Sequence, residues 1–141
     1  MEKIVLKGHR VSKGTAAGEA LVTKDPIAFF GGGDAETGCI TDRLHELNGV
    51  CVSGKILMFP EEKGSAGSSM QLYEMKVCGT QPAAMINIRC GSTVAVGAIA
   101  SDIPMVDDLS PDPYIHIKTG DWVEVDATNG VLTVYPKRPI D

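Results

Sequence analysis

The chain has 141 residues, of which 43% are hydrophobic and 22% charged, a composition typical of one soluble folded domain and not of a disordered segment. Its net charge of −5 and its scattered basic residues argue against nucleic acid as the main ligand, because phosphate binding needs a concentrated basic face. No apolar run approaches the roughly 20 residues of a membrane span, and the first residues lack a signal-peptide pattern. We therefore expect residues 1–141 to form a single cytoplasmic domain without membrane contact.

The first third of the chain combines a predicted strand with an unusual glycine-rich loop. Residues 19–23 have strand-like composition, and residues 29–38 read Phe-Phe-Gly-Gly-Gly-Asp-Ala-Glu-Thr-Gly. Three consecutive glycines cost conformational entropy, so they indicate a tight turn or a close approach of the backbone to another group. The alternative is an exposed turn packed under the two aromatic rings. On the first interpretation, the candidate substrate contacts of this loop are Gly32, Gly33 and Asp34.

Three apolar runs in the middle of the chain predict short buried strands. They cover residues 55–59, 83–88 and 103–106, and Pro104 favours a position near a sheet edge for the last one. The segments between them have the length of helices. Strands joined in this way indicate right-handed crossovers and a small parallel sheet.

The two segments between these strands carry helix signals of different strength. Residues 68–78 predict a helix with Ser68 or Ser69 as its N-cap and Gly79 as its C′ residue. Residues 92–100 predict a shorter helix, weakened by valines and a glycine.

The flanks of this αβ core predict further β-structure. Residues 122–126 alternate apolar and polar side chains, Asn129 and Gly130 give a type I′ hairpin signal, and residues 131–135 form the returning strand. We therefore expect an α/β fold with a small central parallel sheet, flanking helices and a terminal β-hairpin. Such β/β/α layering is the shape of a swivelling domain.

A second glycine-rich loop, residues 59–69, joins the first core strand to its helix. Ligands of open α/β sheets bind outside the carboxyl ends of strands, and unpaired amides at a helix start favour a carboxylate, a phosphate or an oxyanion. Lys63 adds a positive charge beside them. A Walker A loop is excluded, because its lysine would follow the glycines and here it precedes them. The alternative is a serine-rich helix cap without any ligand.

The serines of this second loop suggest proton abstraction and not acyl transfer. Serine is a poor base unless its alkoxide is stabilised, which helix-start amides and a nearby cation can do. The pattern Gly-x-Ser-x-Gly is missing, and the loop contains no histidine. The candidate site residues of the loop are Lys63, Gly64, Ser65, Ser68 and Ser69.

The four cysteines are spread along the chain with no close pair, which excludes the spacing of zinc knuckles and ferredoxin-type clusters. We expect them to be small buried residues kept reduced. The alternative is that one of them faces a metal centre held by a partner. The cysteines are Cys39, Cys51, Cys78 and Cys90.

Other polar residues carry weaker signals. The histidines are isolated from one another, although His45 follows the first glycine-rich loop, and Arg89 stands at a strand end where it could bind a carboxylate. Asp107 and Asp108 are interpreted as helix-capping residues. The alternative is that they face the same end of the sheet as the second glycine-rich loop.

Four motifs that follow one another in order resemble a known family, the aconitase X swivelling domain, which also occurs as the small subunit of phosphomevalonate dehydratases. They are the Phe-Phe-Gly-Gly-Gly-Asp-Ala-Glu-Thr-Gly segment at 29–38, Gly-Lys-Ile-Leu-Met-Phe-Pro at 54–60, Lys-Gly-Ser-Ala-Gly-Ser-Ser at 63–69, and Val-Gly-Ala-Ile-Ala-Ser-Asp-Ile-Pro-Met-Val-Asp at 96–107. The resemblance covers about residues 8–135. Four ordered motifs are far more specific than a single glycine loop.

This resemblance implies a hydro-lyase that dehydrates a small hydroxy acid. A large partner subunit would carry an iron–sulfur cluster that acts as a Lewis acid on the substrate hydroxyl, and this chain would bind no cofactor of its own. By position, Ser65 would be the base that removes a proton from carbon. Ser68 and Ser69 resemble the Gly-Ser-Ser helix start of aconitase-like domains and are further candidates for the base or for carboxylate contacts.

The loop departs from the family in one respect that bears on the substrate. Archaeal phosphomevalonate members typically read Gly-Ser-Thr-Val-Gly-Ser, whereas this chain reads Gly-Ser-Ala-Gly-Ser-Ser from residue 64. The difference shifts the expected substrate modestly toward cis-3-hydroxy-L-proline and away from mevalonate 5-phosphate. The competing class is a non-catalytic swivelling binding or carrier module, although a phosphohistidine carrier would need a histidine in a glycine-rich loop.

Overall fold

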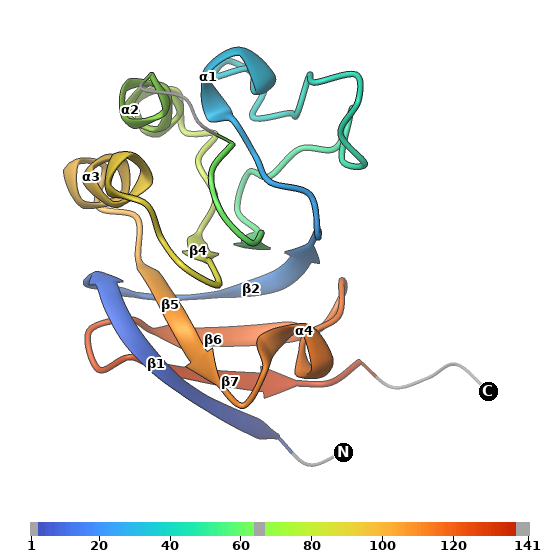
Figure 1. Cartoon of the computed structure of the whole chain (residues 1–141), viewed down its shortest axis with the longest axis vertical. Helices are drawn as coiled ribbons and strands as arrows, with labels where there is room; N and C mark the ends of the chain where they lie inside the picture. The colour runs from blue at the N-terminus through green and yellow to red at the C-terminus, as the bar shows by residue number, and fades with distance from the viewer. Residues whose placement is uncertain (1–2, 64–66, 138–141) are drawn as a thin grey trace.

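The computed structural model describes residues 3–63 and 67–137, and in that part of the chain seven strands close into one barrel. The strand order around the barrel is β1-β5-β4-β3-β2-β6-β7, and helices α1, α2 and α3 gather on one side of it (Figure 1). The elements in chain order are β1 (Ile4–Ser12), β2 (Thr15–Val22), α1 (Phe29–Gly32), β3 (Ile56–Met58), α2 (Ser68–Cys78), β4 (Ala84–Ile86), α3 (Ser92–Ala100), β5 (Met105–Ser110), α4 (Pro113–His116), β6 (Trp122–Asp126) and β7 (Val131–Tyr135).

The barrel joins a parallel half to an antiparallel half. Strands β2, β3, β4 and β5 pair in parallel, whereas β1, β6 and β7 make only antiparallel pairs. Helix α2 links β3 to β4 and α3 links β4 to β5, so each of these parallel steps has its crossover helix. The expected α/β fold, with a small parallel sheet, flanking helices and a terminal hairpin, is confirmed.

Two features of the sheet differ from the sequence prediction. Strand β5 lies between β1 and β4 and not at an edge, because Pro104 precedes the strand and contributes its carbonyl, which accepts a hydrogen bond from Met85 N at 2.9 Å. Strand β1 was not predicted at all. Only Leu6 and Ser12 are buried along this strand. Because so few of its side chains face a core, its sequence lacks the apolar–polar alternation that would predict a strand.

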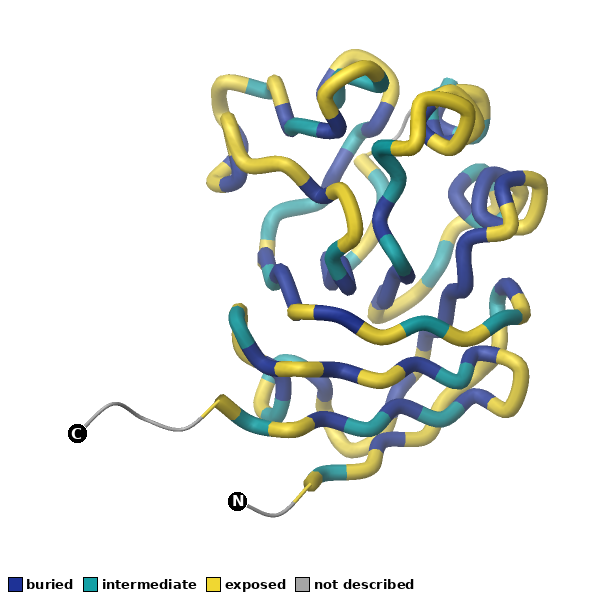
Figure 2. Tube along the Cα trace, turned by 180° about the vertical axis from the view of Figure 1, so that it is seen from behind, coloured by how far each residue is buried: buried dark blue, intermediate teal, exposed yellow. Residues whose placement is uncertain are grey.

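The parallel strands separate two hydrophobic cores. Ile56 and Met58 of β3 point into the barrel, and Leu57 between them points toward the helices, as the two-residue period of a strand requires. Figure 2 shows a similar alternation along β6 and β7, where buried residues alternate with exposed or partly buried ones. The barrel core includes Leu6, Ile86, Val106 and Leu132, and the helix-side core includes Phe29, Phe59, Leu72, Met75 and Val94.

Helix α2 has the predicted bounds but not the predicted N-cap residue. Its N-cap is Gly67, so Ser68 is the first helical residue and caps nothing. At the other end, Gly79 adopts the left-handed conformation with φ 74°, which confirms its predicted C′ role. The start of the helix is therefore free of a side-chain cap, and this affects the site described below.

The terminal hairpin is present, but its turn is not the predicted two-residue type. Asp126 pairs with Val131, which leaves a four-residue loop closed by a 3.1 Å hydrogen bond from Gly130 N to Ala127 O. A type I′ turn needs a positive φ at both central residues, and here Gly130 (φ 67°) has one while Asn129 does not. The Asn129 side chain instead donates to Asp126 Oδ2 at 2.8 Å.

Candidate functional site

The carboxyl ends of β3 and β4 lie side by side and deliver two helix starts to one region. Ile88 N donates to Pro60 O at 3.0 Å, and Asn87 Nδ2 donates to Phe59 O at 2.9 Å, so the loops after the two strands are bonded together. Helices α2 and α3 begin directly after these loops. Their amino-terminal amides carry partial positive charge and favour an anionic ligand.

Helices α2 and α3 pack closely because α3 has a glycine where they touch. A Cβ at Gly97 would lie 2.9 Å from Ser69 Cα and 2.8 Å from Leu72 Cδ1. Any side chain at this position would push the start of α2 outward. The spacing of the two helix starts therefore depends on Gly97, which the sequence analysis had only counted as a weakness of the helix.

The two glycine-rich loops, far apart in the sequence, meet at the start of α2. A Cβ on Gly67 would lie 2.5 Å from Phe30 Cγ, so the Phe30 ring rests directly on this glycine. One turn along, Gln71 Nε2 donates to Gly33 O at 2.8 Å. Helix α1 thus lies against α2, as Figure 1 shows.

Lys63 lies within the second glycine-rich loop and contacts residues on either side of the first one. Its backbone amide donates to Ile27 O at 3.0 Å, and its ammonium lies 3.7 Å from Asp42 Oδ2. The lysine side chain is 59% exposed, so this ion pair contributes little to stability. With Asp25 and His45, these two charged residues border a small cavity of ≈ 200 Å³.

The predicted serines differ in what the structure says of them. Ser65, the proposed base, and Gly64 lie outside the described residues. Ser68 is completely buried, and its Oγ has no hydrogen-bond partner among the described residues. Ser69 is half-buried beside α3. A buried hydroxyl without a partner costs about 1–3 kcal/mol. Ser101 Oγ is also buried without a partner among the described residues, but only Ser68 lies at the start of α2.

The three predicted residues of the first loop are all engaged in local structure. Gly32 O accepts from Thr41 N at 3.0 Å, and Gly33 O is taken by Gln71. Asp34 accepts from Glu36 N at 3.0 Å through one carboxylate oxygen and from Thr37 Oγ1 at 3.1 Å through the other. These contacts shape the loop, and the predicted substrate contacts of the three residues stay a prediction.

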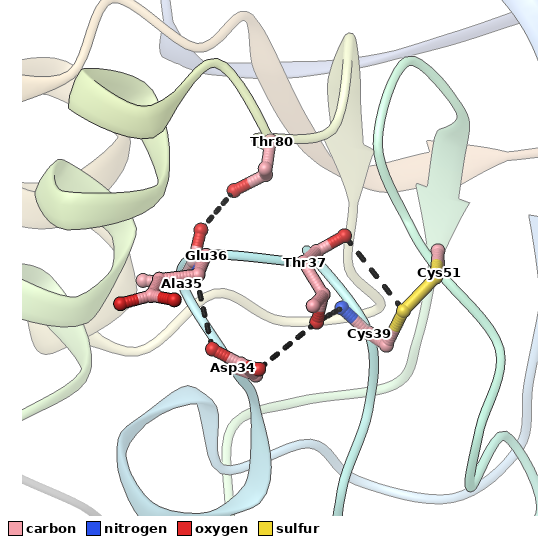
Figure 3. The surroundings of a disulfide bond; sticks show 7 residues. All are labelled: Asp34, Ala35, Glu36, Thr37, Cys39, Cys51 and Thr80. Atoms are coloured by element: carbon pink, nitrogen blue, oxygen red, sulfur yellow. Dashed lines mark hydrogen bonds between the residues drawn. A yellow bond between two sulfur atoms is a disulfide. The ribbon is translucent and has the colours of Figure 1, made fainter.

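The expectation of four buried, reduced cysteines is wrong. Cys39 and Cys51 form a disulfide between two short antiparallel segments, next to the Asp34 turn and Thr80 (Figure 3). Cys78 and Cys90 are free, and Cys78 is exposed at the end of α2. The spacing argument failed because it looked for neighbours in sequence, whereas the chain between residues 39 and 51 folds back on itself.

Arg89, a residue to which the sequence analysis gave little weight, borders a cavity at this end of the sheet. The cavity has a volume of ≈ 460 Å³ and lies at the start of α3. Its lining combines a cation, two hydroxyl residues and two carboxylates. Its lining residues are Glu61, Glu62, Arg89, Cys90, Gly91, Ser92 and Thr93.

A buried carboxylate fixes the loop that carries Arg89. Asp107 accepts from Cys90 N at 2.9 Å, and its other oxygen pairs with His9 Nδ1 at 3.2 Å. Asp107 therefore holds the segment before α3 and is not the N-cap, which is Gly91. Burial, with smaller contributions from Asp107 and Glu62, raises the pKa of the Cys90 thiol to about 12, so Cys90 is a neutral packing residue at neutral pH.

His45 is a structural residue and no carrier of phosphate. It is buried, its Nδ1 accepts from Leu47 N at 3.0 Å, and its Nε2 lies 3.3 Å from Asp25 O. Because Nδ1 accepts, Nε2 must carry the proton and donate. Both ring nitrogens are therefore engaged within the fold.

The described ranges 3–63 and 67–137 show neither a metal-binding cluster nor a membrane-spanning helix. Within them, no group of three or more His, Cys, Asp or Glu side chains is placed to hold a metal ion. No helix there has the length and apolar content to cross a bilayer.

A closed barrel with crossover helices on one side, and two glycine-rich loops brought together at a helix start, defines a swivelling β/β/α domain. The chain belongs to the aconitase X swivel domain family, which matches residues 5–134.

Its similarity to individual relatives extends over nearly the whole chain. The phosphomevalonate dehydratase small subunit of Methanocella arvoryzae is 50% identical over 127 residues, covering 90% of this chain and 96% of the relative. That of Methanosarcina acetivorans is 44% identical over 132 residues, covering 94% and 92%. The crystal structure of Thermococcus kodakaraensis aconitase X in its holo-form matches with a TM-score of 0.90 and 41% identity, covering 94% of this chain and 99% of that chain. The predicted identity as a hydro-lyase small subunit is confirmed.

Proposed function

We propose that this chain is the small subunit of a dehydratase acting on mevalonate 5-phosphate, in an active site completed by a large subunit. The observation that carries the proposal is the meeting of both glycine-rich loops at the uncapped start of α2, where Ser68 Oγ is buried without a partner among the described residues. A buried hydroxyl without a partner at a helix start favours a ligand there. The relatives that bear this enzyme name support the same substrate.

The start of α3 is the proposed binding place of the substrate phosphate. Arg89 lines the cavity with the hydroxyl residues Ser92 and Thr93, and the amides of the first turn lie at the same end of the helix. Guanidinium groups and helix-start amides both suit a phosphate. Asp107, by fixing Cys90 N, keeps this turn in place.

The proton-transfer step is assigned to the second glycine-rich loop, residues 59–69. Ser65 takes a proton from a substrate carbon, and the substrate hydroxyl leaves as water from the neighbouring carbon, so a double bond forms and no oxidant is needed. The amides that start α2 stabilise the alkoxide that the serine needs. Ser68, buried in the first turn, contributes a hydrogen bond to the bound substrate.

The iron–sulfur cluster implied by the family is assigned to the large subunit. The described cysteines of this chain do not fit a cluster, because two are joined to each other and the others lie before α3 and at the end of α2. When bound, the cluster would act as a Lewis acid on the substrate hydroxyl. A cytoplasmic location belongs to the same proposal, since a reducing compartment suits an oxygen-sensitive cluster.

Mevalonate 5-phosphate replaces cis-3-hydroxy-L-proline, which the loop sequence had slightly favoured. Arg89 in the lining of the α3 cavity suits a phosphate, whereas Glu61 and Glu62 in the same lining would suit the ring amine of hydroxyproline. Only an assay with both compounds separates these two uses of one cavity.

The decisive experiment mixes the purified chain with its large subunit under anaerobic conditions and offers each compound separately. We expect dehydration of mevalonate 5-phosphate and none of cis-3-hydroxy-L-proline. Mass spectrometry of the product measures the loss of water. In the same assay Ser65→Ala should lower kcat at least about a hundredfold, the usual contribution of a general base. Co-elution of the two subunits should not change.

Ser53→Ala is the matched control, because Ser53 is an exposed serine away from both helix starts. This variant should keep full activity. A pair that dehydrates only hydroxyproline would overturn the proposed substrate, and normal turnover by Ser65→Ala would overturn the proposed base. A pair inactive on both compounds would favour a binding module.

A further inference from the structure

Phe30 makes a contact that its exposure does not explain. Its side chain is 59% exposed, yet its ring rests on Gly67, where a Cβ would lie 2.5–2.9 Å from three ring carbons. Exposed aromatic rings contribute little to a core. Phe30 belongs to neither hydrophobic core, so its packing on Gly67 is a contact between the two glycine-rich loops.

The backbone around Phe30 is built to present the ring. Phe30 itself has φ −78° and ψ 120°, outside helical values, and Gly31 follows with φ 85°. A left-handed φ is easily adopted only by glycine, so Gly31 lets the chain turn sharply after Phe30. Gly33 then supplies the carbonyl that binds Gln71 of α2 at 2.8 Å. The run of glycines thus joins α1 to α2 at two successive places.

The part of the second glycine-rich loop before residue 64 also contacts the segments that flank the first loop. Ile27 and Lys63 are linked by a backbone hydrogen bond of 3.0 Å, and Ile27 N donates to Glu61 O at 3.3 Å. The Lys63–Asp42 ion pair adds a side-chain contact. Residues 64–66 are therefore flanked by two ends, Lys63 and Gly67, that both contact the segment around the first glycine-rich loop.

We propose that Phe30 is a positioning residue for the dehydratase, whose ring sets the start of α2 by packing on Gly67. The inference rests on the proposed function, because the loop that it positions carries the proposed base, Ser65. Phe30 acts through its contact with Gly67 at the start of α2. The first glycine-rich loop is on this account a clamp for the second.

The test compares Phe30 variants in the reconstituted two-subunit enzyme. Phe30→Ala should lower kcat about tenfold to a hundredfold, the effect expected when a reacting group is misplaced by about 1 Å, with KM changed less than about threefold. Phe30→Tyr keeps the ring face and should retain nearly full kcat. Ile115→Ala, which truncates another exposed apolar residue far along the chain in α4, is the control and should change nothing.

A double-mutant cycle with Gly67 gives the sharper result. Gly67→Ala alone should lose most activity, because its Cβ would lie 2.5–2.9 Å from three ring carbons and must displace the ring. In the Phe30→Ala background the same substitution should cost less than about threefold more. Gly67 has φ −83°, which alanine adopts freely, so backbone strain cannot produce this pattern.

Three outcomes would overturn the inference while leaving the proposed function intact. They are full kcat for Phe30→Ala in an active enzyme, additive effects of the two substitutions, and coupling seen only in the unfolding of the isolated chain. An inactive wild-type pair would instead count against the proposed function, so the two failures are distinguishable.

Discussion

The barrel core and the helix-side core lie on opposite faces of the same parallel strands, but they support different parts of the molecule. The barrel core takes most of its side chains from strands that pair with one another. The helix-side core includes Phe29, Phe59 and Leu72, which belong to the loops and helix that frame the candidate site. Damage to the first core should therefore cost stability alone, and damage to the second should also cost activity.

A matched pair of leucines tests this difference most directly. Leu132 of β7 and Leu72 of α2 are both fully buried, one in each core. Truncation of either to alanine should lower the free energy of unfolding by about 2–5 kcal/mol, measured by urea titration of the isolated chain. Because Leu72 also packs against Gly97 beside the start of α2, only Leu72→Ala should lower kcat as well, by at least about tenfold in the reconstituted enzyme.

The assay temperature must keep both variants folded, so that kcat reports geometry and not the folded fraction. Equal losses of kcat for the two variants would mean that the two cores are not functionally distinct. Full kcat for Leu72→Ala would show that α2 keeps its position without this side chain.

The disulfide belongs to the loop region above the helix-side core, and it gives the next largest expected effect. Cys39 and Cys51 are separated by 12 positions, and a crosslink over a loop of that length contributes up to about 3 kcal/mol by restricting the unfolded chain. Cys39→Ser should lower the free energy of unfolding by up to that amount, and Cys78→Ser, at the exposed end of α2, should leave it nearly unchanged.

Alkylation followed by mass spectrometry checks the pairing itself. Under denaturing conditions without reductant two cysteines should be labelled, and with reductant four. Four labelled cysteines without reductant would show that Cys39 and Cys51 are not joined in the isolated protein, as a reducing compartment would favour.

Much of the barrel and its helices could be predicted because their signals are local. The strand at 122–126 and the helix at 68–78 have the predicted bounds, since each carries its own period and its own end signals. Strand β1 could not be predicted, because it is recognised by its pairing with β5 and β7, which are distant in sequence. Its residues from Lys7 to Arg10 are exposed and carry no pattern.

The site was predictable in its composition but not in its contacts. The glycine runs marked both loops, yet no feature of either predicts that Phe30 lies on Gly67 or that Cys39 reaches Cys51. Both contacts depend on how the chain folds back through residues 33–55. Arg89 was visible at a strand end, but its value depends on the cavity formed by the neighbouring loop.

The two free cysteines test how tightly the helix-side core is packed at the site. Cys90 is half-buried against that core, whereas Cys78 is exposed. Burial, followed by the charges of Asp107 and Glu62, raises the pKa of Cys90 to about 12, and only a thiolate reacts with iodoacetamide. At pH 8 Cys90 should therefore react at least about a hundredfold more slowly than the exposed Cys78, because each unit by which a pKa rises lowers the thiolate fraction about tenfold.

The raised pKa of Cys90 also makes the free energy of unfolding fall at high pH. The folded protein holds the Cys90 proton more tightly than the unfolded chain, in which the thiol has its ordinary pKa of 9.0. The stabilisation is complete below pH 9 and is lost as the pH rises toward 12, so the urea midpoint should fall across that interval. Cys90→Ala should flatten this part of the profile. If Cys90 is labelled as fast as Cys78 in the native protein, the core is open at the start of α3, and the cavity beside Arg89 is wider than the structure describes.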